Sequence, residues 1–434
     1  MRYTPISAST YTEHRRRLTA RLPAQSLVII QSNDIMPSNA DGSMGFAQNS
    51  DLLYLSGVDQ EESILVLFPD AGDEKQREML FVRETSEYIA VWEGEKLTKS
   101  QATELSGIRQ VHWLQDFETH FRQLMCQAKN VFLNANEHAR AKIDVESREL
   151  RFARRCRDEY PLHHYERLAP LMHELRVIKS PEELTQLQEA IRITDSGFRR
   201  LLGFVKPGVQ EFEVEAELAH EFIRNRASGF AYTPIIASGA NACVLHYVTN
   251  DAPCKDGDML LLDIAARYGN YNADLTRTIP VNGRFTERQL AVYKAVLRVF
   301  RACCQMLRPG VIIHEYQKEV GKMMESELIG LGLLKRDEVE KQDPERPLFK
   351  KYFPHGTSHH LGLDVHDVGN TWKPIQAGMV FTVEPGIYIR EEKMGVRLEN
   401  DILIGEHGNT DLMASIPIEP EEIEELMRSK QALI

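Results

Sequence analysis

Short apolar runs alternate with turn-forming residues up to about residue 170, which is the pattern of strands in a small sheet. Two stretches, 11–22 and 117–128, instead repeat apolar residues at helical spacing. Together these patterns predict a mixed sheet with helices, and therefore a separate α/β domain. The expected strands are 26–31, 52–55, 64–68, 79–82, 89–92 and 131–133.

The rest of the chain repeats one order of elements. Ser180 and Thr286 each open a capping box, closed by Glu183 and Gln289, so a helix is predicted to start at both places. Each helical pattern stops at a basic residue followed by Pro-Gly-Val, and a second helix and a strand-rich segment come next. The two stops lie 102 residues apart. We infer an internal duplication; a chance match of four residues is the alternative.

The domain boundary is predicted within 169–180, just before the first capping box. We therefore expect an N-terminal α/β domain at 1–173 and a second domain at 174–434. Within the second, the polar stretch 335–351 predicts a loop or weak helix, and 419–428 a surface helix.

Composition limits the classes of function. A net charge of −12 on 434 residues argues against a general nucleic-acid binder. No apolar run approaches the roughly 18 residues of a membrane helix, and no secretory signal is recognised, so we expect a cytoplasmic protein without a membrane partner. The six cysteines form no Cys-x-x-Cys pair, which disfavours a disulfide scaffold and a thiolate zinc site.

An acidic residue ends a predicted buried strand, where an ionised carboxylate needs a partner. The apolar run before Asp263 is followed by the turn signal Tyr268-Gly269-Asn270. A hairpin with its turn centred between Tyr268 and Gly269 places Asp274 opposite Asp263, with about 5 Å between the Cβ atoms. The first pair of carboxylates is therefore predicted to lie on one hairpin.

The same reasoning pairs Glu384 with Glu399 across a turn at 391–392. Any single acid is more simply explained as a surface or salt-bridged residue, but two matched pairs are not. Four apposed carboxylates carry a charge that two divalent cations would neutralise, so we predict a two-metal site. Oxygen ligands favour Mn²⁺ or Mg²⁺, and one added imidazole favours Mn²⁺, Co²⁺ or Zn²⁺.

Four of the 15 histidines lie within twelve residues: His355, His359, His360 and His366. One imidazole is expected to complete the metal site, and the others to hold substrate or move protons. Spacing alone gives His246 no functional weight. A Gly-x-Ser-x-Gly motif is absent from the sequence, which weighs against a serine hydrolase of the α/β type.

Together, these motifs resemble the pita-bread metallopeptidases, and within them the aminopeptidase P family. The motifs are Leu262-Asp263, 273–278, 355–359, 362–369, 382–386 and 397–399, and 48–57 resembles the family's N-terminal domain. The resemblance implies an α+β fold: a C-terminal pita-bread catalytic domain of duplicated helix–helix–strand units, and an N-terminal α/β creatinase-like domain for substrate gating and oligomerisation. It covers nearly the whole chain.

The resemblance also implies an activity, the hydrolysis of the N-terminal Xaa-Pro bond of peptides. Two divalent ions, usually manganese, or else zinc or cobalt, would be held by Asp263, Asp274, His359, Glu384 and Glu399. Asp274 and Glu399 would bridge them. A hydroxide shared by the ions would attack the scissile carbonyl, and Glu384 would pass a proton to the leaving proline nitrogen.

Further residues are implied to act around the substrate. His246 and His366 would contact it and stabilise the oxyanion, while His355 and Tyr388 would line the pocket for proline. Arg397 would orient the carboxylate ligands.

Self-association as a homodimer or homotetramer is implied as well, with Trp92 reaching the active site of a neighbouring subunit.

One departure from the family's motifs stands out: Ile264-Ala265 replaces the usual Ala-Gly or Val-Gly after the first ligand. Two alternatives stay open, a prolidase that cleaves only Xaa-Pro dipeptides and a metal-free pita-bread protein, either creatinase-like or a binding scaffold.

Overall fold

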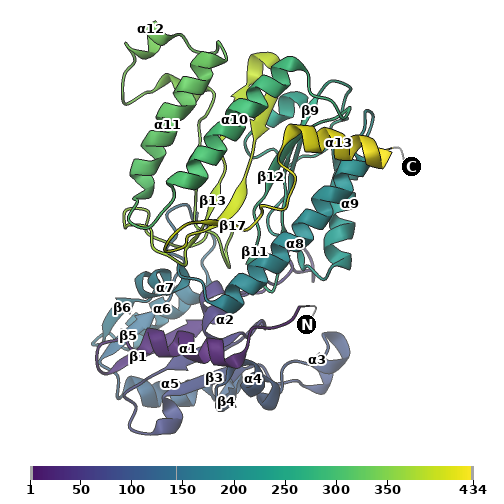
Figure 1. Cartoon of the computed structure of the whole chain (residues 1–434). Coiled ribbons are helices and arrows are strands. Elements are labelled where there is room, and N and C mark those ends of the chain that lie inside the picture. Colours follow the sequence, from purple (N-terminus) through teal and green to yellow (C-terminus); the bar gives the residue numbers. More distant parts are fainter. Residues whose placement is uncertain (1–2, 143, 432–434) are drawn as a thin grey trace. The chain divides into compact units, whose positions relative to one another are not determined.

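The structure is a computed structural model that describes residues 3–142 and 144–431. It divides into two compact units, Pro5–Arg176 and Val177–Ile434, the latter joined by Met1–Thr4 (Figure 1). Among the described helices, none combines the length and apolar character needed to cross a bilayer. All six cysteines are free thiols, as expected.

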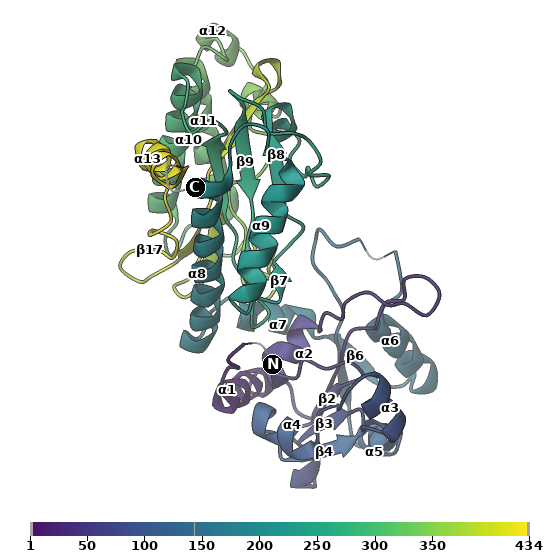
Figure 2. The ribbon, with the colours of Figure 1, turned by 90° about the vertical axis from the view of Figure 1, so that its right-hand side faces the viewer.

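The unit Pro5–Arg176 is built on a mixed six-stranded sheet in the order β4-β3-β2-β1-β5-β6 (Figure 2). Its strands are β1 Ser26–Gln31, β2 Ile64–Leu67, β3 Glu78–Val82, β4 Gln110–Trp113, β5 Asn130–Leu133 and β6 His164–Arg167. Its helices are α1 Ala8–Thr19, α2 Ser50–Ser56, α3 Glu87–Trp92, α4 Lys99–Ser106, α5 Phe117–Met125, α6 Arg148–Glu159 and α7 Ala169–Arg176. Every residue of β1 is buried, and Leu27 and Ile29 share a core cluster with Phe121 of α5 and Phe152 of α6.

Four of the six strands expected in this unit are confirmed, and two are wrong. Residues 52–55 lie in α2, where the Asn49 side chain caps two backbone N–H groups and Gly57, with φ of 69°, ends the helix. Residues 89–92 lie in α3, capped by Ser86. Short apolar runs suit strands and buried helices equally well, and here the caps decide between them.

The second unit has the duplicated helices that the capping boxes predict. Its helices are α8 Pro181–Phe204, α9 Glu211–Arg224, α10 Glu287–Met306, α11 Ile313–Gly330, α12 Arg336–Val339 and α13 Pro420–Gln431. Both boxes form, at Ser180–Glu183 and Thr286–Gln289. The Pro-Gly-Val stops separate α8 from α9 and α10 from α11, and Gly208 and Gly310 have φ of 95° and 90° there. Only glycine adopts such angles without strain, which explains the repeated stop.

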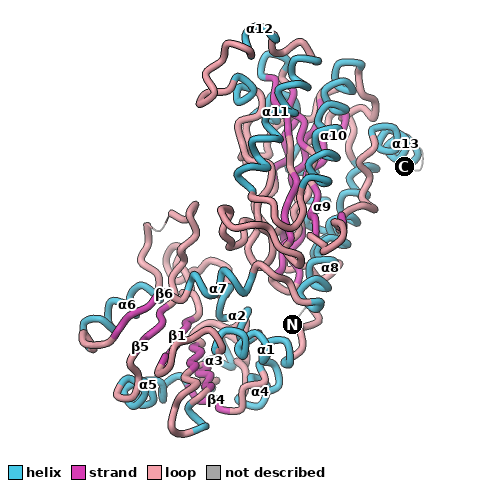
Figure 3. The backbone as a smooth tube through the Cα atoms, turned by 60° about the vertical axis from the view of Figure 1, so that its left-hand side comes forward, coloured by secondary structure: helices cyan, strands magenta, loops and turns pink. Residues whose placement is uncertain are grey.

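Small antiparallel sheets follow each helix pair. The first half contains β7 Gly229–Phe230, β8 Ile235–Ser238, β9 Met259–Asp263, β10 Ala266–Tyr268, β11 Tyr271–Asn272 and β12 Thr276–Pro280. The second contains β13 Val380–Val383, β14 Gly386–Ile389, β15 Met394–Arg397, β16 Asn400–Leu403 and β17 Thr410–Asp411. In this unit the strands gather in the middle, with helices around them (Figure 3). The expected α+β architecture, with strands after each of two helix pairs in the second unit, is confirmed.

The register predicted for the second hairpin is confirmed. Gly386 pairs with Arg397 in β14–β15, and Val383 pairs with Asn400 in β13–β16. Both pairings continue a single register in which Glu384 lies opposite Glu399.

The register predicted for the first hairpin is wrong by two residues. Asp263 pairs with Thr276 rather than Asp274, and the turn is centred between Gly269 and Asn270. Both turn residues have positive φ, 57° and 66°, which a two-residue hairpin turn of this type requires. A slip of two residues keeps every side chain on its predicted face, so the two acids become diagonal neighbours on one face.

Candidate metal centre

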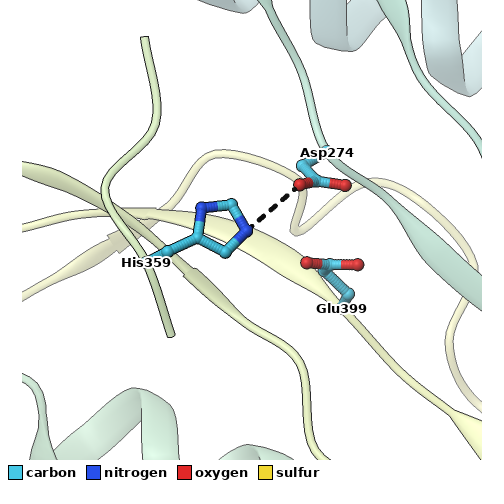
Figure 4. A group of neighbouring side chains, drawn as sticks. All are labelled: Asp274, His359 and Glu399. Atoms are coloured by element: carbon cyan, nitrogen blue, oxygen red, sulfur yellow. Dashed lines mark ion pairs between the residues drawn. The ribbon is translucent and has the colours of Figure 1, made fainter. Parts of the chain in front are cut away.

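Three side chains from separate segments converge between the two hairpins. Single ligand atoms of Asp274, His359 and Glu399 all lie within 4.8 Å of one another (Figure 4). His359 Nε2 is 3.4 Å from Asp274 Oδ2, and the hydroxyl of Thr276 donates to Glu399 Oε2 at 2.6 Å. The hairpins are joined at this point, because the Glu399 N–H donates to the Thr276 carbonyl at 3.0 Å.

The remaining two acids border this group. Asp263, at the end of β9, receives the Arg397 guanidinium at 2.5 Å. The hydroxyl of Tyr232 lies 2.5 Å from Asp263 Oδ1 and 2.7 Å from Asp274 Oδ1, and so links the two carboxylates. Glu384 Oε1 is 3.6 Å from His359 Nε2. The structure therefore brings together all five side chains expected to bind metal.

Burial makes four separate negative charges unfavourable here. It raises the pKa of Glu399 well above its ordinary value, with repulsion from Asp274 adding to the effect. Burial likewise raises the pKa of Asp263, opposed by the positive charge of Arg397. For Glu384, burial raises the pKa to about 7 although His359 and Arg397 oppose it. Four carboxylates and one imidazole with this excess of negative charge fit divalent cations.

A chain of hydrogen bonds leads from Arg397 away from the acids. Arg397 Nη1 donates to the Tyr388 hydroxyl at 2.9 Å, and Tyr388 in turn lies 2.8 Å from His355 Nε2. Burial, with the charge of Arg397, lowers the pKa of His355 to about 3, so its imidazole is neutral. The other ring nitrogen lies 2.7 Å from the Gly356 carbonyl, to which it donates. His355, Tyr388 and Arg397 thus form one polar wall beside the carboxylates.

The other histidines expected at the site lie at its border. The ring of His366 meets the His359 ring edge-on, with 4.5 Å between centroids. His246 is exposed, in the turn after the 3₁₀ helix Gly239–Cys243, and lies close enough to His355 to contribute to the lowering of the His355 pKa. Trp92 belongs to the other unit, on α3, and is 73% exposed.

Comparison with known proteins agrees with this geometry. The model of metallopeptidase family M24 matches residues 185–406, and that of the aminopeptidase P N-terminal domain matches residues 11–132. The Xaa-Pro aminopeptidase of Escherichia coli is 36% identical over 97% of this chain and 98% of its own length. The chain belongs to the aminopeptidase P family of metallopeptidases.

Solved structures of aminopeptidase P have the same fold. The Pseudomonas aeruginosa aminopeptidase has a TM-score of 0.89 at 30% identity, covering 99% of each chain. The E. coli aminopeptidase P with the inhibitor Pro-Leu has a TM-score of 0.87 at 34% identity, covering 99% of this chain and 100% of its own. The expected family, fold and enzyme class, a metal-dependent aminopeptidase, are confirmed.

Sequence reasoning missed two residues that support the aminopeptidase P centre. Tyr232 lies just after a two-residue strand, β7, and no pattern in the sequence marks it. Asp401 is fully buried and accepts the Asp274 backbone N–H at 3.1 Å. Its position, two residues after Glu399, places it on the same face of the chain, and this spacing could have found it.

The departure at 264–265 is absorbed by the core. Ile264 and Ala265 are 0% and 1% exposed and belong to the main hydrophobic cluster of the unit. The extra Cβ of Ala265 therefore packs among apolar side chains.

Tyr232→Phe is expected to weaken metal binding by about 10- to 100-fold, the usual cost of losing a group that orients metal ligands. The hydroxyl is the link between Asp263 and Asp274, and its loss leaves both carboxylates free to separate. Titration calorimetry of the metal-free variant with Mn²⁺ measures the change. Tyr247→Phe, which removes a hydroxyl bonded to Glu211 instead, is the control; equal affinities for wild type and Tyr232→Phe would contradict the prediction.

Proposed function

We propose that this chain hydrolyses the bond between the N-terminal residue and a proline in the second position of a peptide. The observation that carries the proposal is the convergence of four carboxylates and one imidazole in a member of this family. Curated relatives bear the name Xaa-Pro aminopeptidase, and the E. coli enzyme was solved with Pro-Leu as inhibitor. Both facts support a peptide substrate that contains proline.

Two divalent cations are proposed as the cofactor. The residues that would hold them are Asp263, Asp274, His359, Glu384 and Glu399. We propose manganese, with zinc or cobalt as alternatives, because one imidazole accompanies the four carboxylates. When bound, such ions polarise the scissile carbonyl and activate water. A zinc-substituted form of the E. coli relative was solved with product, which supports divalent ions in general.

Glu384 is proposed to move the proton during bond cleavage. In the metal-free chain burial raises the pKa of Glu384 to about 7. Bound ions would lower that value, so in the loaded enzyme Glu384 would take up a proton from water only as water attacks the carbonyl. As the C–N bond breaks, Glu384 would give that proton to the proline nitrogen, which leaves as a neutral amine. His359 Nε2 lies 3.6 Å from Glu384 Oε1, so the two side chains would hold the same ions.

The polar wall beside the carboxylates is proposed to bind the substrate. His355 and Tyr388 would line the pocket for proline, and Arg397 would hold the carboxylate ligands in place through its bond to Asp263. His246 and His366 would contact the peptide and stabilise negative charge on the carbonyl oxygen.

Self-association is proposed from the resemblance, as a homodimer or homotetramer. The N-terminal unit would serve gating and oligomerisation, and Trp92, exposed on α3, would reach the active site of a neighbouring copy. Light scattering of Trp92→Ala tests this role; an unchanged oligomer with unchanged KM would remove Trp92 from it.

A peptide panel tests the activity. With Mn²⁺, we expect cleavage of Xaa-Pro-Xaa tripeptides and longer peptides, and no cleavage when alanine replaces proline. Cleavage of dipeptides alone would indicate a prolidase. No cleavage, with less than one ion bound per chain, would indicate a metal-free scaffold, which the five retained donors do not favour.

A further inference from the structure

A buried ion pair lies in the catalytic unit, outside the carboxylate centre. Lys179 Nζ is 3.0 Å from Asp367 Oδ2, and the two side chains are 2% and 1% exposed. Lys179 directly precedes Ser180, the N-cap of α8, where the positive end of the helix dipole disfavours a cation. The stability of α8 therefore does not explain a lysine at this position.

Asp367 connects the ion pair to the backbone on both sides of His366. Its second oxygen, Oδ1, accepts the N–H of Val368 at 2.9 Å. Its own N–H donates to the carbonyl of His360, also at 2.9 Å. A carboxylate used in this way fixes the path of the chain from His360 to Val368.

The segment 360–369 has no other regular framework. Residues 361–379 contain no helix or strand, so the path of the chain depends on individual hydrogen bonds. Two of them are backbone bonds, from the Leu361 N–H to the Val380 carbonyl and from the Asn272 N–H to the Gly362 carbonyl. Asn272 donates to the carbonyls of Gly362 and Leu363 at 3.3 and 2.8 Å. A Cβ at Gly362 would lie only 2.3 Å from Asp367 Oδ2 and 2.8 Å from Lys179 Nζ. The segment thus packs against the ion pair so closely that only glycine fits.

This segment carries His366 to the carboxylate centre. The His366 ring packs edge-on against the ring of His359, whose Nε2 lies among the carboxylates. Because Asp367 is the next residue in the chain, a shift of its backbone moves the His366 backbone as well.

We propose that the ion pair between Lys179 and Asp367 positions His366 for its contact with the substrate. The pair acts through the backbone of 360–369, which Asp367 holds at His360 and at Val368. The inference rests on the proposed function, in which His366 contacts the peptide. Small displacements of a catalytic group cost up to about a hundredfold in rate, so loss of the pair should lower kcat about 10- to 100-fold.

The test removes both charges at once. Lys179→Met alone takes the lysine cation away from the buried Asp367 carboxylate and is expected to melt at a lower temperature. The double variant Lys179→Met with Asp367→Asn removes both charges of the pair and should recover most of that loss in melting temperature. We expect its metal content to equal that of the wild type while kcat stays low. Recovery of kcat together with melting temperature would overturn the proposal.

The same double substitution in the His366→Ala variant separates positioning of His366 from a general effect on stability. In His366→Ala protein, the double substitution should lower kcat no further, whereas a merely structural pair would lower it equally in both backgrounds. The control is the matched buried pair of the other unit, Arg176 and Asp51, whose atoms lie 2.9 Å apart. Its removal by Arg176→Met with Asp51→Asn should leave kcat within about twofold, the spread of a neutral substitution.

Hydrogen exchange supplies a measurement that does not need activity. Amides of 360–369 should exchange faster in the Lys179→Met, Asp367→Asn double variant than in wild type, while those of α8 do not change. Unchanged exchange in 360–369 would overturn the inference even if the enzyme cleaves Xaa-Pro peptides. If the double variant shows faster exchange but the wild-type enzyme cleaves no Xaa-Pro peptide, the proposed function is overturned and the inference about the segment is not.

Discussion

Glu399→Ala is expected to abolish Xaa-Pro hydrolysis and to lower the bound metal. The Glu399 carboxylate lies opposite Glu384 in the second hairpin and within 4.8 Å of the donors of Asp274 and His359. Its loss removes a carboxylate that would bind the ions and that accepts the Thr276 hydroxyl, while the backbone bond between the hairpins remains. A shared ligand contributes several kcal/mol, so kcat/KM should fall about 10³-fold or more. Elemental analysis after Mn²⁺ loading and a tripeptide assay measure both effects.

A surface acid of the same hairpin provides the control. Glu391 lies at the hairpin tip, pairs with Lys351 in solvent, and has a side chain that is 61% exposed. Glu391→Ala should keep full activity and full metal content, since an exposed ion pair contributes little. Near-normal turnover of Glu399→Ala would remove this residue from the site. Full metal content with no turnover would show that Glu399 is not a metal ligand.

The sequence predicts the register of the second hairpin correctly and that of the first hairpin wrongly, and the turns explain the difference. At 391–392 the polar residues of the turn are symmetrical about its centre, so the register of Glu384 and Glu399 follows directly. In the first hairpin the turn signal Tyr268-Gly269-Asn270 includes Tyr268, but this residue pairs with Tyr271. The residues that need positive φ are Gly269 and Asn270. The difference changes the partner of Asp263 but not its face, so Asp263 and Asp274 still lie on the same side of the hairpin.

The helices and strands were predicted correctly where the local sequence signals agree with one another. Capping boxes at Ser180 and Thr286 located two long helices to the residue, because the cap and the apolar periodicity agree there. At 52–55 and 89–92 four apolar residues carried no period of their own, and the caps at Asn49 and Ser86 decided the structure.

Side chains that act through tertiary contacts could not be found from the sequence. Tyr232 reaches Asp263 from 31 positions away, and Lys179 reaches Asp367 from 188. Neither partner is marked by spacing, since loops of such length can close in many ways. Such pairs become visible only once the fold brings the segments together.

Chelation is expected to lower the melting temperature, because a metal that binds only the folded protein stabilises it in proportion to the logarithm of its concentration over Kd. The metal-free protein must hold the carboxylates of Asp263 and Asp274 side by side, linked through Tyr232, with Glu399 close to Asp274. Scanning calorimetry with Mn²⁺ and with EDTA measures the difference. Glu399→Ala protein is the control, in which EDTA should change the melting temperature much less.

The effect of EDTA should also grow with pH. The pKa of Glu384 is about 7 in the folded chain against an ordinary value of 4.5, so between these values the metal-free folded protein holds a proton that the unfolded chain has lost. Its stability therefore falls as pH rises through this window, by at most about 3 kcal/mol at 1.36 kcal/mol per pKa unit. Metal binding needs ionised carboxylates, so the stability that the metal adds increases as pH rises. The gap between loaded and chelated melting temperatures should be wider at pH 8 than at pH 5.5, and a gap that is absent or narrows with pH would contradict a buried, shared metal site.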